Sequence, residues 1–178
     1  MAHHVAGCRD APGSLGEAAT QREHNEKMIP KHHKLKKSWI WDKEVEDFVR
    51  QRIQGHSLNV PAGKSKLGDV RGDIDPQDPG VIKVEMNALP FPDETFDTVV
   101  QDPPWKIGFY QRMKPFFECV RVCKQGGTII YNAYWIPQSK DVELIEIYIR
   151  QDSPWANTSI ISVFRKKSHG EDLNNYLE

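Results

Sequence analysis

The residues best suited to chemistry are "DPPW", Asp102 to Trp105, which come directly after an apolar run. Proline can neither donate to a sheet ladder nor continue a helix, so Pro103 and Pro104 must lie just beyond a strand end. Each proline also pushes the residue before it toward extended geometry, which stiffens Asp102 and Pro103. The stretch therefore offers fixed hydrogen-bond acceptors beside an aromatic ring that can stack on a planar group. A rigid loop with a half-buried tryptophan is the alternative explanation.

A sheet must position this motif, and the chain contains enough apolar runs to build one. Two helices are expected, over 43–53 and 108–125. In the first, apolar residues recur at helical spacing behind Asp42, a plausible N-cap. The second ends at Gly126-Gly127, and Pro115 within it marks where the regular helix starts. Strands are expected over 56–60, 69–75, 80–86, 95–102, 127–135, 142–151 and 158–167.

This order of elements predicts an α/β fold with a mostly parallel sheet. The last two strands have no helix between them, which predicts an antiparallel hairpin at one edge. The connections 62–69 and 76–80 leave room for at most one helical turn. The helices that would follow the first two strands are therefore reduced. The run "TFDTVVQD", 95–102, has an apolar centre suited to a strand buried on both faces.

Length and composition are those of a soluble globular domain: 178 residues, 38% hydrophobic and 28% charged. No run approaches the roughly 20 apolar residues of a membrane span, and the first residues lack the apolar core of a signal peptide. A cytoplasmic location is the expectation. Three cysteines make an odd number, and Cys119 and Cys123 have the pattern of buried positions, so no disulfide framework is expected. No spacing of cysteine and histidine fits a metal site.

Four segments divide the chain. Residues 1–27 are small and polar with no sustained apolar period, which predicts a disordered tail. Residues 28–42 form a basic and aromatic arm, residues 43–167 the folded domain, and residues 168–178 a C-terminal tail.

The arm contains "KHHKLKK" followed by "SWIW", whereas the net charge of the chain is −1. Cations next to ring faces suit contacts with phosphates and bases, and the candidates for nucleic-acid contact are Lys34, Lys36 and Lys37. The second basic run is "FRKK", 164–167. A solvated surface is the alternative for both runs.

A turn of small residues, "NVPAGKSKLG", follows the first expected strand. A nucleoside-triphosphate loop would need glycine at position 58, where Leu58 stands, so that function is excluded. The turn nevertheless lies at the carboxyl edge of a sheet, where open α/β folds bind ligands. The next strand ends in Asp73 and Asp75. An acid about ten residues past such a turn can accept both hydroxyls of a ribose. Surface acids capping a loop are the alternative.

Two longer segments, "VEMNALPFPDETFDTVVQDPPW" and "ECVRVCKQGGTIIY", resemble consecutive signatures of class I S-adenosylmethionine-dependent methyltransferases. The resemblance covers about residues 43–167. It implies a minimal Rossmann-like sheet of seven strands and S-adenosylmethionine as cofactor. The residues that it assigns to cofactor binding are Pro61, Ala62, Gly63, Asp73, Asn87, Ala88 and Asp102.

The first glycine-rich turn departs from the family pattern of an acid followed by alternating glycines. Asn59, Pro61, Gly63 and Ser65 stand at the corresponding positions, and only Gly63 keeps its glycine. Gly63 still permits close approach of the backbone to the methionine part of the cofactor. The resemblance places Asp73 at the ribose, and Asn87 where many relatives have an acid facing the adenine amine.

The "DPPW" motif resembles the D/N/S-P-P-aromatic motif of enzymes that methylate exocyclic amines of nucleobases, or amide nitrogens. An aromatic amine delocalises its lone pair into the ring and is a poor nucleophile. Asp102 and the carbonyl of Pro103 can each accept a hydrogen bond from it, favouring a localised lone pair, and the prolines fix these acceptors. Trp105 would stack on the base, which is worth about 1–3 kcal/mol in comparable contacts. The absence of a cysteine before the prolines argues against methylation at carbon 5 of cytosine.

The sequence therefore predicts a methyltransferase for adenine N6 in DNA or RNA. The alternatives are cytosine N4, guanine N2 or a protein glutamine amide, and a catalytically silent nucleic-acid-binding subunit of this fold. Tyr134 and Trp135 follow the fifth strand and are either walls of the substrate pocket or core aromatics. The arm, the loop "YWIPQSKD" or a second subunit would grip the nucleic acid; the second subunit is either another copy of the chain or a different protein. No membrane partner is expected.

Overall fold

The computed structural model describes residues 41–104, 111–150 and 159–168. By internal contacts the chain divides into residues 1–33 and 34–178, and everything described belongs to the second unit. Trp105, the three arm lysines and both predicted tails therefore lie outside the described residues, apart from Ser168.

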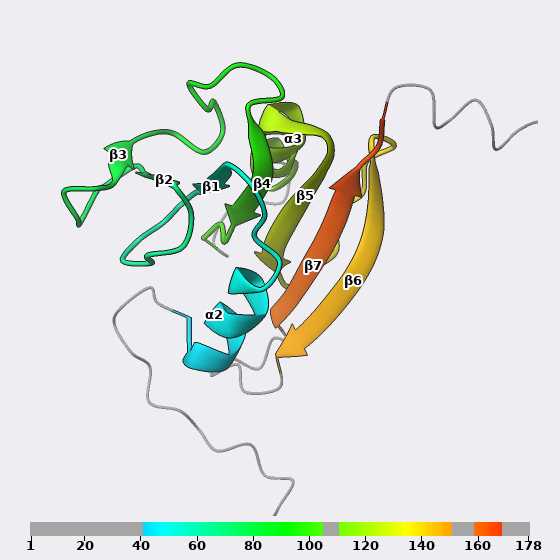
Figure 1. Ribbon diagram of the computed structural model, residues 1–178, viewed down its shortest axis with the longest axis horizontal. Coiled ribbons are helices and arrows are strands. Elements are labelled where there is room, and N and C mark those ends of the chain that lie inside the picture. Colours follow the sequence, from blue (N-terminus) through cyan, green and yellow to red (C-terminus); the bar gives the residue numbers. More distant parts are fainter. Residues whose placement is uncertain (1–40, 105–110, 151–158, 169–178) are drawn as a thin grey trace, which may run out of the picture. The chain divides into compact units, whose positions relative to one another are not determined.

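Seven strands form one sheet in the order β3-β2-β1-β4-β5-β7-β6 (Figure 1). All neighbours pair in parallel except β7, which runs antiparallel to both β5 and β6. The predicted fold class is therefore confirmed, including the C-terminal hairpin. The strands are β1 Ser57–Asn59, β2 Val70–Asp73, β3 Ile82–Lys83, β4 Phe96–Gln101, β5 Cys123–Ala133, β6 Val142–Arg150 and β7 Ser159–Lys166.

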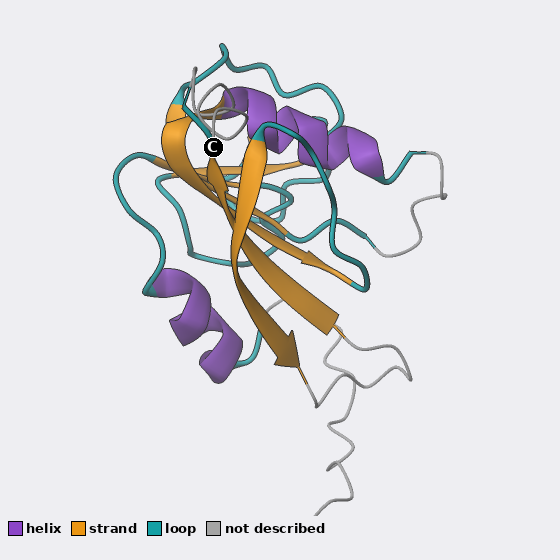
Figure 2. Ribbon diagram, turned by 90° about the vertical axis from the view of Figure 1, so that its right-hand side faces the viewer, coloured by secondary structure: helices purple, strands orange, loops and turns teal. Residues whose placement is uncertain are grey.

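Among the described residues, helices α2 and α3 cover opposite faces of the sheet (Figure 2). Helix α3, Met113–Val122, packs through Phe116 on the larger apolar cluster, which includes Tyr131 and Phe164. Helix α2, Lys43–Arg50, packs through Val45 and Val49 on the smaller cluster, which includes Ile130 and Ile161. Strand β4 contributes to both clusters, because Val99 faces the first and Val100 the second. The strand that leads into "DPPW" is thus buried on both faces, as predicted.

Helix α2 begins where the sequence places it. The Asp42 side chain accepts a hydrogen bond from the Val45 backbone N–H at 3.1 Å, which satisfies one free donor of the first turn. The helix ends at Arg50, three residues before the predicted end, and continues as a turn. Arg52 in this turn lies 3.5 Å from the Phe48 ring centroid and forms two 2.7 Å hydrogen bonds with Glu146 of β6.

Helix α3 ends earlier than the sequence predicts, at Val122 instead of Gln125. The cause is pairing with β4: Cys123 already stands opposite Phe96, and Lys166 of β7 donates to the Cys123 carbonyl at 2.8 Å. Gly126-Gly127 is therefore not a helix stop but lies within β5. Gly126 has a φ of 73°, a conformation that glycine adopts without steric cost.

The connections after β1 and β2 contain no helix in the described residues, in agreement with the short loops of the sequence. Strands β2 and β3 are shorter than predicted, and β3 has only Ile82 and Lys83. Ile74 and Ile82 keep exposed fractions of 60% and 46% at this end of the sheet. The region is pared down because no helix is available to bury its apolar side chains. No helix in the described residues is both long and apolar enough to cross a membrane.

Cys119 and Cys123 are free thiols with no exposed surface. Burial raises the pKa of the Cys123 thiol to about 12 and raises that of Cys119 well above its usual range. Because thiolates are the reactive form, we expect neither thiol to react with a disulfide reagent at pH 8 while the protein is folded. In a Cys8→Ser variant, Cys119 and Cys123 are the two cysteines that remain. Rapid colour development with Ellman's reagent before denaturant is added would contradict the burial of the two thiols.

Candidate active site

Four strand ends meet at one edge of the sheet, and Asp102, Pro103 and Pro104 of the motif are at this edge. Asp102 follows β4, the turn 60–69 follows β1, and Asp73 ends β2. Because these strands are parallel to one another and to β5, their carboxyl ends lie on the same side. The predicted cofactor and substrate residues that the structure describes are thus gathered where open α/β sheets bind ligands.

The Asp102 carboxylate accepts hydrogen bonds at both of its oxygens. The indole Nε1–H of Trp41 donates to Oδ2 at 2.8 Å, and the amide Nδ2–H of Asn132 donates to Oδ1 at 2.9 Å. The hydroxyl of Ser159 donates in turn to Asn132 Oδ1 at 2.7 Å. None of these three donors was identified from the sequence. A polar residue inside the apolar strand "GTIIYNAYW" was the one available signal for Asn132.

The two prolines of the motif line a small pocket. Pro103 is buried and Pro104 is exposed. The pocket, about 10 Å³ in volume, is completed by Arg112, Tyr131, Ala133, Tyr134 and Trp135. This is about the volume that one water molecule occupies, so a nucleobase would have to lie across its mouth rather than inside it.

Trp135 lines the same pocket as the two prolines, and it also packs against the core. Its ring packs against the larger apolar cluster and makes an edge contact with Tyr131 at 6.3 Å. The Arg112 guanidinium lies 4.5 Å from the ring centroid. A cation over a tryptophan ring is a favourable contact, and here it places a positive charge at the rim of the pocket.

The turn after β1 folds back on β2. The Gly63 backbone N–H donates to Asp73 Oδ2 at 2.8 Å, and the Ala62 N–H donates to the Gly72 carbonyl at 2.7 Å. Gly63 has a φ of 52°, which explains why glycine stands here. Asn59, at the position of the acid in the family pattern, donates from its buried amide to the Leu67 carbonyl at 3.2 Å and closes the turn.

Asn87 has an unpaired hydrogen-bond acceptor. Its Nδ2–H donates to Glu85 Oε1 at 2.8 Å, which fixes the orientation of the amide, since a carboxylate oxygen is an acceptor. The other amide atom, Oδ1, is buried without a partner. An exocyclic adenine amine is a donor and would satisfy it. These features fit S-adenosylmethionine: Asn87 has an acceptor, Asp73 is an acid, and Gly63 has no side chain.

Arg121 joins the two signature segments. Its guanidinium donates to the carbonyls of Leu89 at 2.9 Å and Phe91 at 2.8 Å, and it forms an ion pair with Glu118 at 2.8 Å. Glu118 also accepts from the Leu89 N–H at 2.7 Å. The neighbouring guanidinium lowers the pKa of the Glu118 carboxyl. The loop that begins with Asn87 and Ala88 is thereby fastened to α3.

Removing this anchor should cost stability. We expect Arg121→Ala to lower the free energy of unfolding by about 1–3 kcal/mol, because two partly buried carbonyls and a carboxylate lose their donor. Urea denaturation measures the change. Arg165→Ala is the matched control: its 2.8 Å pair with Glu143 is exposed, and exposed pairs contribute about 0–1 kcal/mol. Equal losses in the two variants would show that Arg121 is only a surface charge.

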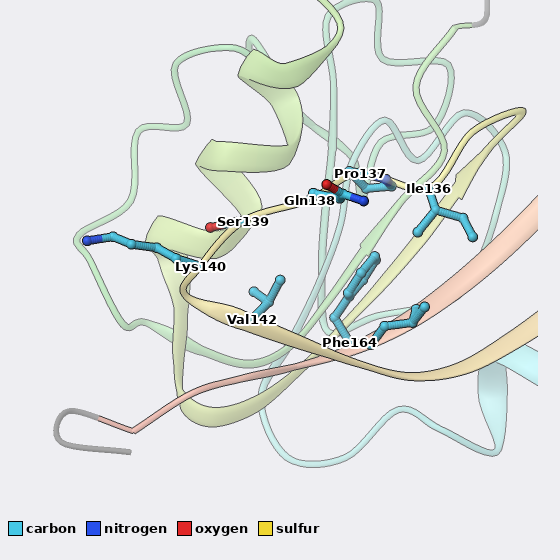
Figure 3. A pocket seen from close by; sticks show the side chains of 8 residues that line it. Ile136, Pro137, Gln138, Ser139, Lys140, Val142 and Phe164 are labelled. Carbon is cyan, nitrogen blue, oxygen red and sulfur yellow. The ribbon is translucent and has the colours of Figure 1, made fainter. Parts of the chain in front are cut away.

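A larger hollow of about 540 Å³ lies under the connection between β5 and β6 (Figure 3). Val142, Leu144 and Phe164 form its floor. Val142 starts β6 opposite Lys166, at the amino edge of the parallel strands, whereas Asp102 lies at their carboxyl edge. The lining of the hollow also includes residues 136–140 of the loop "YWIPQSKD", so the hollow extends from the residue after Trp135 toward the amino edge of the parallel strands. In the part of the chain that the structure describes, no group of three or more His, Cys, Asp or Glu side chains could hold a metal ion.

Comparison with solved structures identifies the fold. The 1,6-didemethyltoxoflavin-N1-methyltransferase of Burkholderia thailandensis, solved with 1,6-didemethyltoxoflavin and S-adenosylhomocysteine, is 9% identical; the match covers 93% of this chain and 99% of that one, with a TM-score of 0.55. A TehB-like methyltransferase of Corynebacterium glutamicum is 13% identical over 86% of this chain and 100% of that one, with a TM-score of 0.50. A chain from the complex of the Haloferax volcanii Trm112 activator with a putative methyltransferase is 12% identical, covering 86% and 97% with a TM-score of 0.50.

These likenesses establish a class of fold. The chain has the Rossmann-like fold of class I S-adenosylmethionine-dependent methyltransferases. At the level of sequence, no family profile and no curated protein matches it.

Proposed function

We propose that the chain is an S-adenosylmethionine-dependent methyltransferase that acts on an exocyclic amine of a nucleobase, adenine N6 in DNA or RNA. The observation that carries the proposal is the Asp102 carboxylate. It lies at the carboxyl end of a buried strand, is followed by two prolines and is held by Trp41 and Asn132. The fold supports the cofactor, and the resemblance of "DPPW" to the motif of amine methyltransferases supports the acceptor.

We assign to cofactor binding the described residues whose hydrogen-bonding groups match those of S-adenosylmethionine. Asp73 would accept from the ribose hydroxyls and Asn87 Oδ1 from the adenine amine, while Gly63 allows the backbone to approach the methionine part. The bound cofactor supplies an electrophilic methyl group on a sulfonium. The carboxylate of Asp73 accepts only from Gly63 and Asp75 backbone N–H groups among the described contacts, so acceptor capacity remains on both oxygens.

The chain's own contribution is to hold the acceptor amine. Asp102 and the Pro103 carbonyl accept the two N–H bonds of the amine, which favours a pyramidal nitrogen with its lone pair localised. The held nitrogen would be placed to accept the methyl group that a bound S-adenosylmethionine would supply, with loss of the carbon–sulfur bond of the cofactor and of one nitrogen proton to solvent. Fixed acceptors make this arrangement effective because they need no reorganisation during the reaction. In a duplex the target base must be flipped out or presented single-stranded.

The nucleic acid would be gripped by cations of the arm and of the pocket rim. The arm supplies Lys34, Lys36 and Lys37, and the rim of the pocket supplies Arg112 over Trp135. Contacts of this kind release counterions, so affinity should fall steeply with salt.

The test is transfer of label from radiolabelled S-adenosylmethionine to single- and double-stranded DNA and RNA, each with an adenine-free control. Label in one adenine-containing pool, absent from its control, would establish the reaction and choose the nucleic acid. Label in the adenine-free control would show that the methylated atom is not adenine N6, and would favour cytosine N4 or guanine N2. Cofactor binding without nucleic-acid label would point to a protein glutamine or a small-molecule amine. Absence of cofactor binding would favour a silent subunit, which the loss of glycines in the first turn makes the second candidate.

A further inference from the structure

We propose that Trp41 and Asn132 are positioning residues that hold the Asp102 carboxylate in the orientation needed for the methyl acceptor. The inference rests on the proposed function, because it assigns to these residues a role in the same reaction. It deepens that function by adding two residues that the "DPPW" motif does not contain.

The two donors reach the carboxylate from different parts of the fold. Trp41 precedes α2 and lies 61 residues before Asp102 in the chain, whereas Asn132 is on the neighbouring strand β5, 30 residues after it. Each donates to a different oxygen, at 2.8 Å and 2.9 Å. Rotation of the carboxylate about its Cβ–Cγ bond would break both hydrogen bonds together. The pair therefore fixes the last torsion of the Asp102 side chain, which the prolines that follow cannot do.

The orientation of the Asn132 amide is itself fixed. An asparagine amide can present either its NH₂ or its oxygen to a neighbour. Here the Ser159 hydroxyl donates to Asn132 Oδ1 at 2.7 Å, so the NH₂ group faces Asp102. Asn132 is 2% exposed and Ser159 is fully buried, so water does not compete for the bond between them. A chain of hydrogen bonds thus runs from β7 through β5 to the end of β4.

This arrangement leaves the carboxylate able to act on a substrate. An indole N–H can only donate, and the Asn132 NH₂ group likewise donates, so both partners use Asp102 as an acceptor. In the proposed function the same carboxylate also accepts from the amine of the substrate. Misplacement of a catalytic group by about 1 Å can cost on the order of 100-fold in rate, which is why the torsion matters.

The experiment compares Trp41→Phe with Tyr148→Phe in the full-length protein. Both variants keep an aromatic ring and remove one hydrogen bond between the α2 region and the rest of the domain, since the Tyr148 hydroxyl donates to Glu44 at 2.7 Å. We expect Trp41→Phe to lower kcat about tenfold, with the KM for the nucleic acid and the affinity for S-adenosylmethionine within about twofold of wild type. Tyr148→Phe should leave all three unchanged.

A spectroscopic readout tests the hydrogen bond without any activity. The indole N–H resonance of Trp41 in a ¹H–¹⁵N spectrum is assigned by its loss in Trp41→Phe, and it should move upfield in Asp102→Ala. Asn132→Asp, which replaces the donor by an acceptor of the same size, should lower kcat further than Trp41→Phe. If this variant does not fold, Trp41→Phe carries the test.

The outcomes are distinguishable. Wild-type kcat in Trp41→Phe, in a protein that methylates its substrate, would overturn the positioning role and leave the proposed function intact. An indole resonance that is unaffected by Asp102→Ala would overturn the contact itself. Absence of methyl transfer by the wild-type protein to every acceptor would overturn the proposed function and the positioning role with it.

Discussion

Replacing Asp102 by alanine is expected to lower kcat for methyl transfer by about 10²- to 10³-fold, the loss typical of removing one preorganised hydrogen-bond partner of a transition state. The reason is that the acceptor amine would keep only the Pro103 carbonyl and would lose the charged partner. The variant would also leave the Trp41 and Asn132 donors without their acceptor. Single-turnover transfer of label from S-adenosylmethionine measures the effect on the chemical step.

Two controls separate catalysis from folding in this experiment. Asp47→Ala removes a surface acid of α2 that pairs only with the exposed Lys43 among the described contacts, and should keep wild-type kcat. Circular dichroism and thermal melting should show that the Asp102→Ala protein is folded. Wild-type kcat in Asp102→Ala would mean that the "DPPW" motif is only a rigid turn, which is the alternative left open by its sequence.

Asp73→Ala is expected to weaken binding of S-adenosylmethionine by about 10- to 150-fold, the equivalent of the 1.5–3 kcal/mol of a hydrogen bond to a charged group. Asp73 is the acid at the end of β2, and its Oδ2 also holds the Gly63 N–H at 2.8 Å. The substitution should therefore remove the ribose acceptor and loosen the turn that approaches the methionine part. Isothermal titration with S-adenosylhomocysteine measures the dissociation constant without requiring catalysis.

Asp75→Ala is the matched control for this effect. Asp75 is two residues further along and exposed, and its side chain accepts from Gln77 Nε2 at 3.0 Å. We expect its affinity for S-adenosylhomocysteine to stay within about twofold of wild type, as for most surface substitutions. If both variants lose affinity equally, the effect comes from the loop as a whole and Asp73 is not the ribose acceptor.

The parts of the fold that were predicted correctly depend on residues close together in the sequence. Asp42 caps α2 because its oxygen needs to reach only three residues ahead, to the Val45 N–H. The apolar centre of β4 marks a strand buried on both faces, whatever covers it. Pro103 and Pro104 end that strand because proline lacks the N–H that a ladder requires. Each of these properties is local, so the sequence alone determines it.

The errors arose where residues distant in the chain compete with local preference. Gly126-Gly127 is a typical helix stop, but α3 ends at Val122 because the following residue pairs with Phe96 of β4. Ladder pairing and the 2.8 Å bond from Lys166 to the Cys123 carbonyl outweigh the last helical turn. No window of sequence around the glycines contains these partners.

The same division applies to the candidate site. The sequence by itself determined a stiff acid at a strand end, a turn of small residues and an acid ten positions after it. Only the tertiary structure decided their partners. Trp41 and Asn132 donate hydrogen bonds to the Asp102 carboxylate, and the Gly63 N–H donates to Asp73. The structure also leaves the Asn87 side-chain oxygen buried without a partner. The physical reason is that short-range sterics fix the direction of the backbone, whereas partners 30 and 61 residues away meet only when the strands align at one edge of the sheet.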